Sequence, residues 1–315
     1  MSIVAEAPGF FQLFSDGSVK RFYPESVPHS SEESLSPNGF KFKDVTIDPS
    51  KPVTARIFIP ADQGSKLKLP VLVYFHGGGF CIGSTTWLGY HHFLGDFCVK
   101  SQSIIVSVDY RLAPENRLPI AYEDCYSSLE WLKQQVSYDS DPWLRAADIS
   151  RIFLSGDSAG ANITHQVAIR ASRNKDRHVS VKGLLMIHPY FGSEKRTAKE
   201  NCDDAVEDVK MNDLFWGLSI PEGLTRDYYG CNFEKQLDVS AAEWSAFPAV
   251  TVYVAGLDFL KERGVMYGEF LAKKGVKEVA IVEAENQPHI YHVFQPESDA
   301  TRLLQSQMSK FIESH

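Results

Sequence analysis

The sequence predicts an α/β fold in which a mainly parallel central sheet carries helices on both faces. The 315 residues can bury a sizeable core, and the content of 43% hydrophobic and 23% charged residues is typical of folded globular proteins. Short apolar runs also alternate along the chain with segments of helical periodicity. This alternation implies right-handed βαβ crossovers, which place parallel strands between two layers of helices.

The apolar runs are predicted as strands. Pro70–Phe75 is apolar throughout, as expected of a strand that is buried on both faces. The predicted strands are 53–59, 70–75, 104–108, 151–155, 183–187, 249–255 and 279–282. The helices predicted between and after them span roughly 90–99, 121–135, 161–173, 261–273 and 299–314.

Two segments depart from the alternation within what is predicted to be a single domain, residues 1–315. Residues 1 to about 45 begin with apolar side chains and continue into prolines and a Ser/Glu-rich stretch, so we expect an attached arm with a loop. Residues from about 194 to 234 are predicted as a helical insertion over the carboxyl edge of the sheet. Ligands of open α/β sheets bind at that edge, so the insertion could cap a pocket.

Composition excludes several classes of function. A formal charge of −8 without clustered basic residues argues against nucleic-acid binding. The chain shows neither a secretory signal nor 18 consecutive apolar residues, so we expect a cytoplasmic protein with no membrane span. For that reason we discount the glycosylation pattern at Asn162. The cysteines lack a C-x-x-C pair and are interpreted as reduced structural thiols: Cys81, Cys98, Cys125, Cys202 and Cys231.

A G-x-S-x-G pattern, Gly156–Gly160, lies between a predicted strand and a predicted helix. Such a sharp turn holds a serine in a strained conformation with Oγ projecting, and the flanking glycines avoid clashes with the neighbouring strand and helix. The pattern alone is weak evidence. Its position between strand and helix makes Ser158 the candidate nucleophile.

A second glycine motif, His76-Gly77-Gly78-Gly79, follows an earlier core strand. Successive glycines let backbone N–H groups turn toward one point, where they can bind the oxyanion formed when a serine attacks a carbonyl. The N–H of Ala159 would complete the donor set. His76 itself is expected to orient the loop.

The serine needs a base, and the base needs an acid that fixes its tautomer. In α/β-hydrolases the acid and the histidine follow the serine in that order, in loops after later strands. Asp258 and His289 fit this placement. Glu262 competes with Asp258 but should already lie on a helix, and His292 competes with His289 but should start the following turn. His165 and His188 are expected to be packing residues.

These motifs together resemble the plant carboxylesterase family, a branch of the hormone-sensitive-lipase-like α/β-hydrolases. The segment Asp109–Glu115 adds to the likeness, which runs from about Phe11 to the C-terminus. The resemblance implies an α/β-hydrolase fold, the triad Ser158, Asp258 and His289, and an N-terminal cap over the pocket. It also implies oxyanion donors at Gly78, Gly79 and Ala159, with Gly77 shaping the loop. Glu262 stands where the family often has Asp.

The expected function is a serine carboxylesterase that acts on a small-molecule ester without metal or cofactor. Similar plant proteins include dehydratases, cyclases and a hormone receptor, so a non-hydrolytic lyase, dehydratase or cyclase and a small-molecule binder stay open. A dinucleotide site at the glycines is disfavoured because Ser84–Trp87 delay the next helix. Candidate pocket residues are Phe80, Cys81, Ile82, Trp87, Phe191, Phe215 and Trp216.

Overall fold

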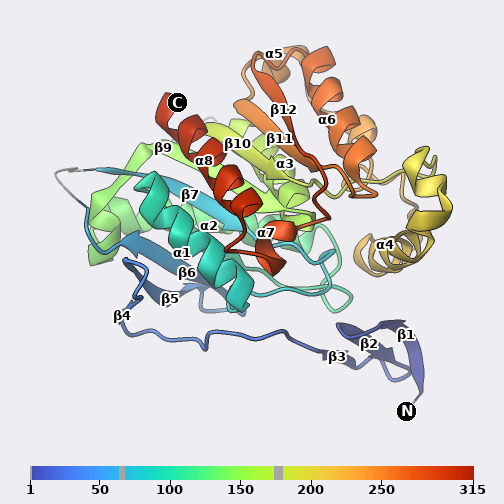
Figure 1. Ribbon diagram of the computed structural model, residues 1–315, viewed down its shortest axis with the longest axis horizontal. Helices are drawn as coiled ribbons and strands as arrows, with labels where there is room; N and C mark the ends of the chain where they lie inside the picture. The colour runs from blue at the N-terminus through green and yellow to red at the C-terminus, as the bar shows by residue number, and fades with distance from the viewer. Residues whose placement is uncertain (1, 64–67, 174–179) are drawn as a thin grey trace.

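The computed structural model describes residues 2–63, 68–173 and 180–315 (Figure 1). Within them, nine strands form one sheet in the order β12-β11-β10-β9-β7-β8-β6-β5-β4. The strands are β4 (Ser34–Leu35), β5 (Phe40–Asp48), β6 (Val53–Pro60), β7 (Leu69–Phe75), β8 (Ile104–Asp109), β9 (Ala147–Asp157), β10 (Val181–Ile187), β11 (Ala249–Ala255) and β12 (Val279–Ala284).

The sheet is mainly parallel, as predicted. The six strands from β12 to β8 run parallel to one another, and β6, β5 and β4 continue the sheet in antiparallel pairing. Every residue of β7 is buried, which explains its continuous apolar sequence. β12 is an edge strand whose Ile281 is 40% exposed. The carboxyl ends of the parallel strands therefore meet at one edge, with β9 near the middle.

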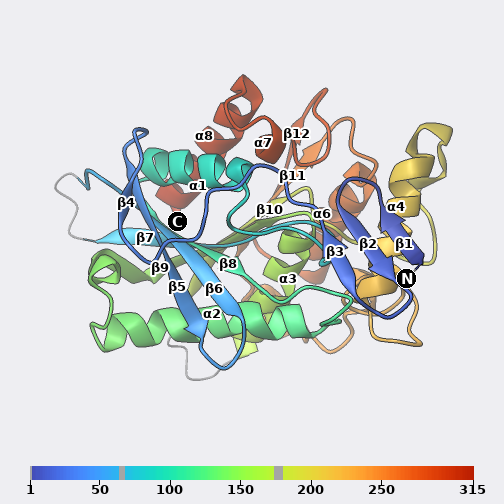
Figure 2. The same ribbon diagram turned by 90° about the horizontal axis from the view of Figure 1, so that it is seen from below.

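Helices cover both faces, which confirms the predicted α/β-hydrolase layering. Figure 2 shows α1 and α2 on opposite sides of the sheet. One apolar cluster joins the sheet to α2, α3 and α6, and the other joins it to α1 and α8. The helices are α1 (Leu88–Ser101), α2 (Ile120–Ser137), α3 (Ala159–Arg173), α4 (Val206–Ser219), α5 (Ala241–Ser245), α6 (Lys261–Lys274), α7 (Tyr291–Phe294) and α8 (Asp299–Ser314).

The N-terminal segment is more regular than the sequence analysis expected. Strands β1 (Ile3–Ala7), β2 (Phe11–Phe14) and β3 (Val19–Arg21) form a small antiparallel sheet of their own, and β4 and β5 belong to the main sheet. In β5, Phe40 and Phe42 are buried on one face while the lysines between and after them are half-buried. This alternation was hidden by the neighbouring prolines and polar residues.

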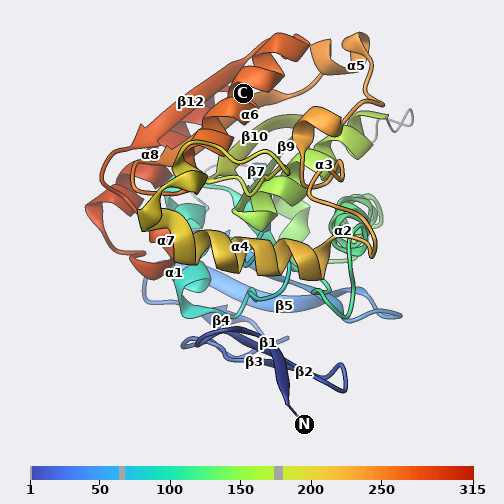
Figure 3. The same cartoon turned by 90° about the vertical axis from the view of Figure 1, so that its right-hand side faces the viewer.

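The small N-terminal sheet and α4 lie together beyond the carboxyl edge of the main sheet (Figures 1 and 3). Phe11 of β2 packs edge-to-face against Phe215 of α4, with ring centroids 6.4 Å apart. Arg21 donates from Nε to the Cys81 carbonyl at 2.6 Å and forms an ion pair with Glu115 at 2.7 Å. These contacts support the proposal that both segments cap a site at this edge.

Two expectations drawn from composition can be compared with the structure. All five cysteines are free thiols, and four of them are buried. Among the described residues, no helix combines the length and apolar character needed to cross a membrane.

Candidate active site

Ser158 occupies the elbow, the sharp turn Gly156–Gly160 between β9 and α3. Its φ angle is +52°, in the left-handed region that L-residues rarely adopt. A Cβ on Gly160 would lie 1.9 Å from the Phe75 carbonyl oxygen, and one on Gly156 would lie 2.4 Å from the Gly160 carbonyl carbon. Both glycines are therefore required by the close approach of β7, β9 and α3, as the motif predicts.

The base and the acid reach this serine from two other loops. His289 Nε2 lies 3.0 Å from Ser158 Oγ, and His289 Nδ1 lies 2.6 Å from Asp258 Oδ2. Asp258 is 3% exposed and also accepts the Leu260 N–H at 2.8 Å. The structure therefore brings together the three residues that the sequence analysis singled out, in the order nucleophile, base and acid.

The charged forms of Asp258 and His289 stabilise each other. Burial disfavours protonation of His289, but the nearby Asp258 carboxylate outweighs it and raises the pKa of His289 above its ordinary value. Burial would likewise raise the pKa of Asp258, yet the charge and hydrogen bond of His289 hold it below its usual range. Asp258 therefore stays ionised. Because its carboxylate accepts the hydrogen bond from His289 Nδ1, His289 Nε2 is the nitrogen that can take the Ser158 proton.

The glycine loop after β7 presents two free amides. Gly78 and Gly79 have φ angles of +105° and +56°, and within the described residues their N–H groups have no protein acceptor. Ala159 is the first residue of α3, so its N–H has no intrahelical acceptor either. Gly77 differs, because its N–H donates to Tyr90 Oη at 2.9 Å and to Asp157 Oδ1 at 3.1 Å. Gly77 is placed to shape the loop.

A buried carboxylate that the sequence analysis missed connects the loop to the elbow. Asp157, next to Ser158, accepts the Tyr74 hydroxyl at 2.7 Å and the Tyr90 hydroxyl at 2.9 Å, in addition to the Gly77 N–H. Burial raises the pKa of Asp157 despite these hydrogen bonds. Its partners lie on β7, on α1 and in the glycine loop, so one side chain fixes three elements around the candidate nucleophile.

The competing residues lie elsewhere. His292 is buried against Phe93, 4.6 Å between ring centroids, and its Nε2 faces the Tyr74 hydroxyl at 3.4 Å. Glu262 accepts the Lys199 N–H at 2.9 Å. His76 stacks on Tyr110 and contacts Asp109 at 3.4 Å, which suits an orienting role in the loop. α1 begins only at Leu88, so no helix N-terminus directly follows the glycines.

A cavity of about 340 Å³ opens over Ser158 and His289. Of the seven candidate pocket residues, Ile82, Trp87 and Phe215 line it. Phe80, Cys81, Phe191 and Trp216 do not line it: these four residues are at most 1% exposed, whereas Ile82, Trp87 and Phe215 are 3–7% exposed. The sequence analysis missed the following lining residues: Phe10, Tyr90, Tyr190, Asp208, Met211, Asn212, Leu257, Phe259, Leu260, Pro288, Ile290 and Phe294.

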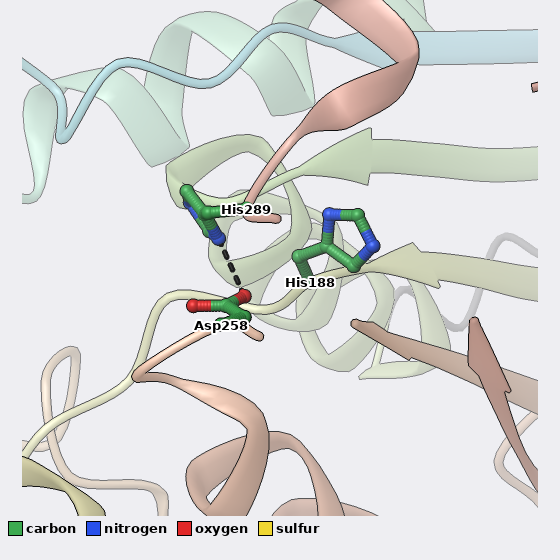
Figure 4. Close-up of side chains that lie close together, drawn as sticks. All are labelled: His188, Asp258 and His289. Atoms are coloured by element: carbon green, nitrogen blue, oxygen red, sulfur yellow. Dashed lines mark hydrogen bonds and ion pairs between the residues drawn. The ribbon is translucent and has the colours of Figure 1, made fainter. Parts of the chain in front are cut away.

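His188, Asp258 and His289 lie close enough to suggest metal ligands (Figure 4). Their ligand atoms fall within 4.8 Å of one another. However, Asp258 Oδ2 is already hydrogen-bonded to His289, and His188 Nδ1 accepts the Ile290 N–H at 3.0 Å. Asp258 Oδ2 and His188 Nδ1 are thus already engaged in hydrogen bonds within the protein, so the geometry favours a hydrogen-bonded catalytic pair over a metal centre.

Comparisons with known proteins relate this chain to α/β-hydrolases of plants. A family model described as the alpha/beta hydrolase fold matches residues 72–293. "Probable carboxylesterase 6" of Arabidopsis thaliana is 37% identical, over 82% of this chain and 77% of the relative. "Tuliposide A-converting enzyme 1, chloroplastic" of Tulipa gesneriana is 36% identical, over 99% of this chain and 78% of the relative.

Solved structures show the same likeness. A hyperthermophilic esterase from the archaeon Pyrobaculum calidifontis superposes with a TM-score of 0.71 at 28% identity, covering 87% of this chain and 85% of that one. EstE1, a thermostable carboxylesterase cloned from a metagenomic library, superposes with a TM-score of 0.74 at 25% identity, covering 90% of each chain.

Proposed function

This chain belongs to the plant carboxylesterase family of α/β-hydrolase-fold enzymes, and we propose that it hydrolyses a small carboxylic ester through an acyl-serine intermediate on Ser158. One observation carries the proposal. Ser158 Oγ, His289 and Asp258 form a continuous series of contacts of 3.0 and 2.6 Å beside the free amides of the glycine loop. This is the arrangement that acyl transfer requires.

In the first half of the reaction, Ser158 Oγ attacks the ester carbonyl carbon while its proton moves to His289 Nε2. The carbonyl oxygen becomes an oxyanion, which the N–H groups of Gly78, Gly79 and Ala159 bind. Removal of one such donor typically costs about 3 kcal/mol of transition-state stabilisation. The intermediate then collapses: the carbon–oxygen bond to the alcohol breaks, and the alcohol leaves with the proton from His289.

In the second half, water enters the place of the alcohol. His289 Nε2 takes a proton from the water as its oxygen attacks the acyl carbonyl, and the same amides bind the second oxyanion. Collapse breaks the bond to Ser158 Oγ, which recovers the proton from His289. The carboxylic acid leaves and the enzyme is restored.

The walls of the cavity favour a small and largely apolar ester. Aromatic and aliphatic side chains from the N-terminal sheet, α4 and the loop near α7 line it, among them Phe10, Met211 and Phe294. Asp208 is the one charged lining side chain apart from Asp258 and His289, within the described residues. A volume of about 340 Å³ lies at the lower end of the range for small-molecule pockets.

A non-hydrolytic fate of the acyl group is a second candidate. It is favoured by one observation, that several relatives are named as tuliposide-converting enzymes. In that case a hydroxyl other than water would resolve the acyl-serine.

Turnover of a panel of short-chain aryl and alkyl esters in ¹⁸O-labelled water tests both candidates. Hydrolysis predicts a free acid that carries one ¹⁸O atom. Products without the label would favour the second candidate, and no turnover of any ester would contradict the first.

A further inference from the structure

The segment that follows β10 touches both the nucleophile and the strand that leads to the acid. Ile187 O accepts the Ser158 N–H at 2.9 Å, and the Tyr190 N–H donates to Ser158 O at 3.0 Å. Between them, the His188 N–H donates to Tyr253 O of β11 at 2.8 Å. Ile187–Tyr190 is therefore held rigidly against the catalytic elbow.

The His188 side chain extends this segment to the loop of the base. Its Nδ1 accepts the N–H of Ile290, the residue after His289, at 3.0 Å. A backbone N–H can only donate, so Nδ1 must be unprotonated and the ring proton must sit on Nε2. His188 is 2% exposed, and within the described residues Nε2 has no hydrogen-bond partner.

The backbone conformation of Ile290 explains why its hydrogen bond to His188 is needed. Ile290 has a φ angle of +46°, in the left-handed region, where a β-branched residue is a true outlier. A conformation of this kind costs of the order of 1–3 kcal/mol and persists only when the surroundings enforce it. Ile290 directly follows the catalytic base His289, and its N–H donates a hydrogen bond to the His188 side chain. This hydrogen bond helps to hold Ile290 in its left-handed conformation.

We propose that His188 is a positioning residue that sets His289 against Ser158. The inference rests on the proposed function, since it assigns His289 as the base. One rigid segment binds the Ser158 backbone on both sides and, through the His188 ring, binds the backbone beside His289. The distance between Oγ and Nε2 is therefore fixed through His188 as well as through Asp258. Figure 4 shows the His188 ring beside the hydrogen-bonded Asp258 and His289 side chains.

The protonation state of His188 suits this role. Burial holds the pKa of His188 well below its ordinary range, so the ring stays neutral and keeps the Nδ1 lone pair. A protonated ring would lose the hydrogen bond to Ile290 and would compete with His289 for the Asp258 carboxylate.

A packing role alone makes a different prediction. The ring also contacts Tyr291 and His292, with centroids 5.4 and 5.8 Å away, and packing there depends on volume and not on an acceptor atom. Two substitutions separate the roles at a residue whose own φ angle is +45°. Both Asn and Gly tolerate this conformation, but only Asn keeps an acceptor bonded to Cγ, where Nδ1 is.

We expect His188→Gly to lower kcat about 100-fold, because a displacement of about 1 Å in a catalytic group has an effect of that size. KM should change less than about 3-fold, since the His188 side chain does not itself line the cavity. His188→Asn should retain kcat to within about 5-fold, as its side-chain oxygen replaces the lost acceptor. Equal losses in both variants, or full activity in His188→Gly, would overturn the proposal.

Amide exchange of Ile290 gives a readout that does not depend on activity, and in the unmodified protein it does not depend on the folding of a variant. In the unmodified protein this amide should be protected from exchange, and in His188→Asn it should stay protected. Exchange at the rate of a free amide in the unmodified protein would overturn the proposal directly. Failure of the proposed function itself would show differently, as no ester turnover with Ile290 still protected.

Discussion

The nucleophile and the base are held in place in different ways. Ser158 is 5% exposed and lies just after β9, in the middle of the sheet, between two glycines where an added Cβ would overlap backbone atoms. His289 has 26% of its side chain exposed and lies in the loop after β12, at the edge of the sheet. The loop is held by a few hydrogen bonds, such as Leu257 N–H to Gln287 O at 3.0 Å.

This difference separates stability from activity. The position of Ser158 is a property of the core, so changes to the glycines that shape the turn around it should affect folding as well as turnover. The position of His289 is a local arrangement, so changes around its loop should affect kcat while the fold is retained. The predictions that follow test this contrast.

The largest effect is expected for Ser158→Ala. Removal of the nucleophile should lower kcat at least about 10⁴-fold, because the rest of a triad does not act without it. The loss of one hydroxyl should leave the thermal unfolding temperature within a few degrees. Steady-state hydrolysis of an aryl ester and a thermal melt measure both quantities. Turnover close to that of the unmodified protein would rule out Ser158 as nucleophile.

Asp258→Asn tests the loop side of the contrast. The amide cannot stabilise the protonated imidazole, and it favours the wrong tautomer, so kcat should fall about 10⁴-fold. The fold should persist, as shown by an unchanged circular dichroism spectrum. A loss of fold equal to that of an elbow variant would contradict the contrast.

The dependence of kcat/KM on pH tests how Asp258 acts on His289. His289 acts as a base only when neutral, and Asp258 raises its pKa, so kcat/KM should rise with pH through a midpoint above 6.5. Without the carboxylate that midpoint should move to lower pH in Asp258→Asn. An unmoved midpoint in the variant would mean that another group titrates.

On the elbow side, Gly160→Ala should destabilise the fold by about 3 kcal/mol or more, because the new Cβ would overlap the Phe75 carbonyl. Gly217→Ala is the matched control. Gly217 is an exposed residue of α4 with no heavy atom within 4 Å of the position that a Cβ would occupy, so alanine there should stabilise by about 0.5–1 kcal/mol. Urea unfolding compares the two, and equal stabilities would refute the role of the glycine.

The smallest effect is expected at the cavity wall. The Asp208 side chain makes no ion pair or hydrogen bond within the described residues and lines the cavity from α4. Asp208→Asn should raise kcat/KM for a carboxylate-bearing ester about 3-fold relative to a neutral ester of the same size, since exposed charges interact by up to about 1 kcal/mol. An unchanged ratio would show that Asp208 lies outside the path of the substrate.

The sequence was sufficient for the residues whose signal is local. Gly156, Ser158 and Gly160 follow from the steric needs of one turn, and Asp258 and His289 follow from chain order and from their places after strands. Tyr90 and His188 were missed as partners of the site because their contacts, with Asp157 and Ile290, span 67 and 102 residues. Long-range pairing of this kind depends on how the elements pack.

The pocket residues illustrate the same limit. Phe80 follows the glycine loop directly, as a wall residue would, but its φ angle of +64° goes with a side chain packed against Tyr190 and Trp216. Phe10 and Phe294 lie near opposite ends of the chain, and both line the cavity. Periodicity identifies such residues as apolar and does not say which of two apolar environments they enter.

The most direct test of the central claim is the mass of the protein after reaction with an aryl phosphonate, followed by peptide mapping. A phosphonate reacts covalently with a serine that is activated by a neighbouring base. One adduct per chain, located on Ser158 and absent from Ser158→Ala, is the predicted result. An adduct on another residue, or none under conditions in which esters are hydrolysed, would contradict the account.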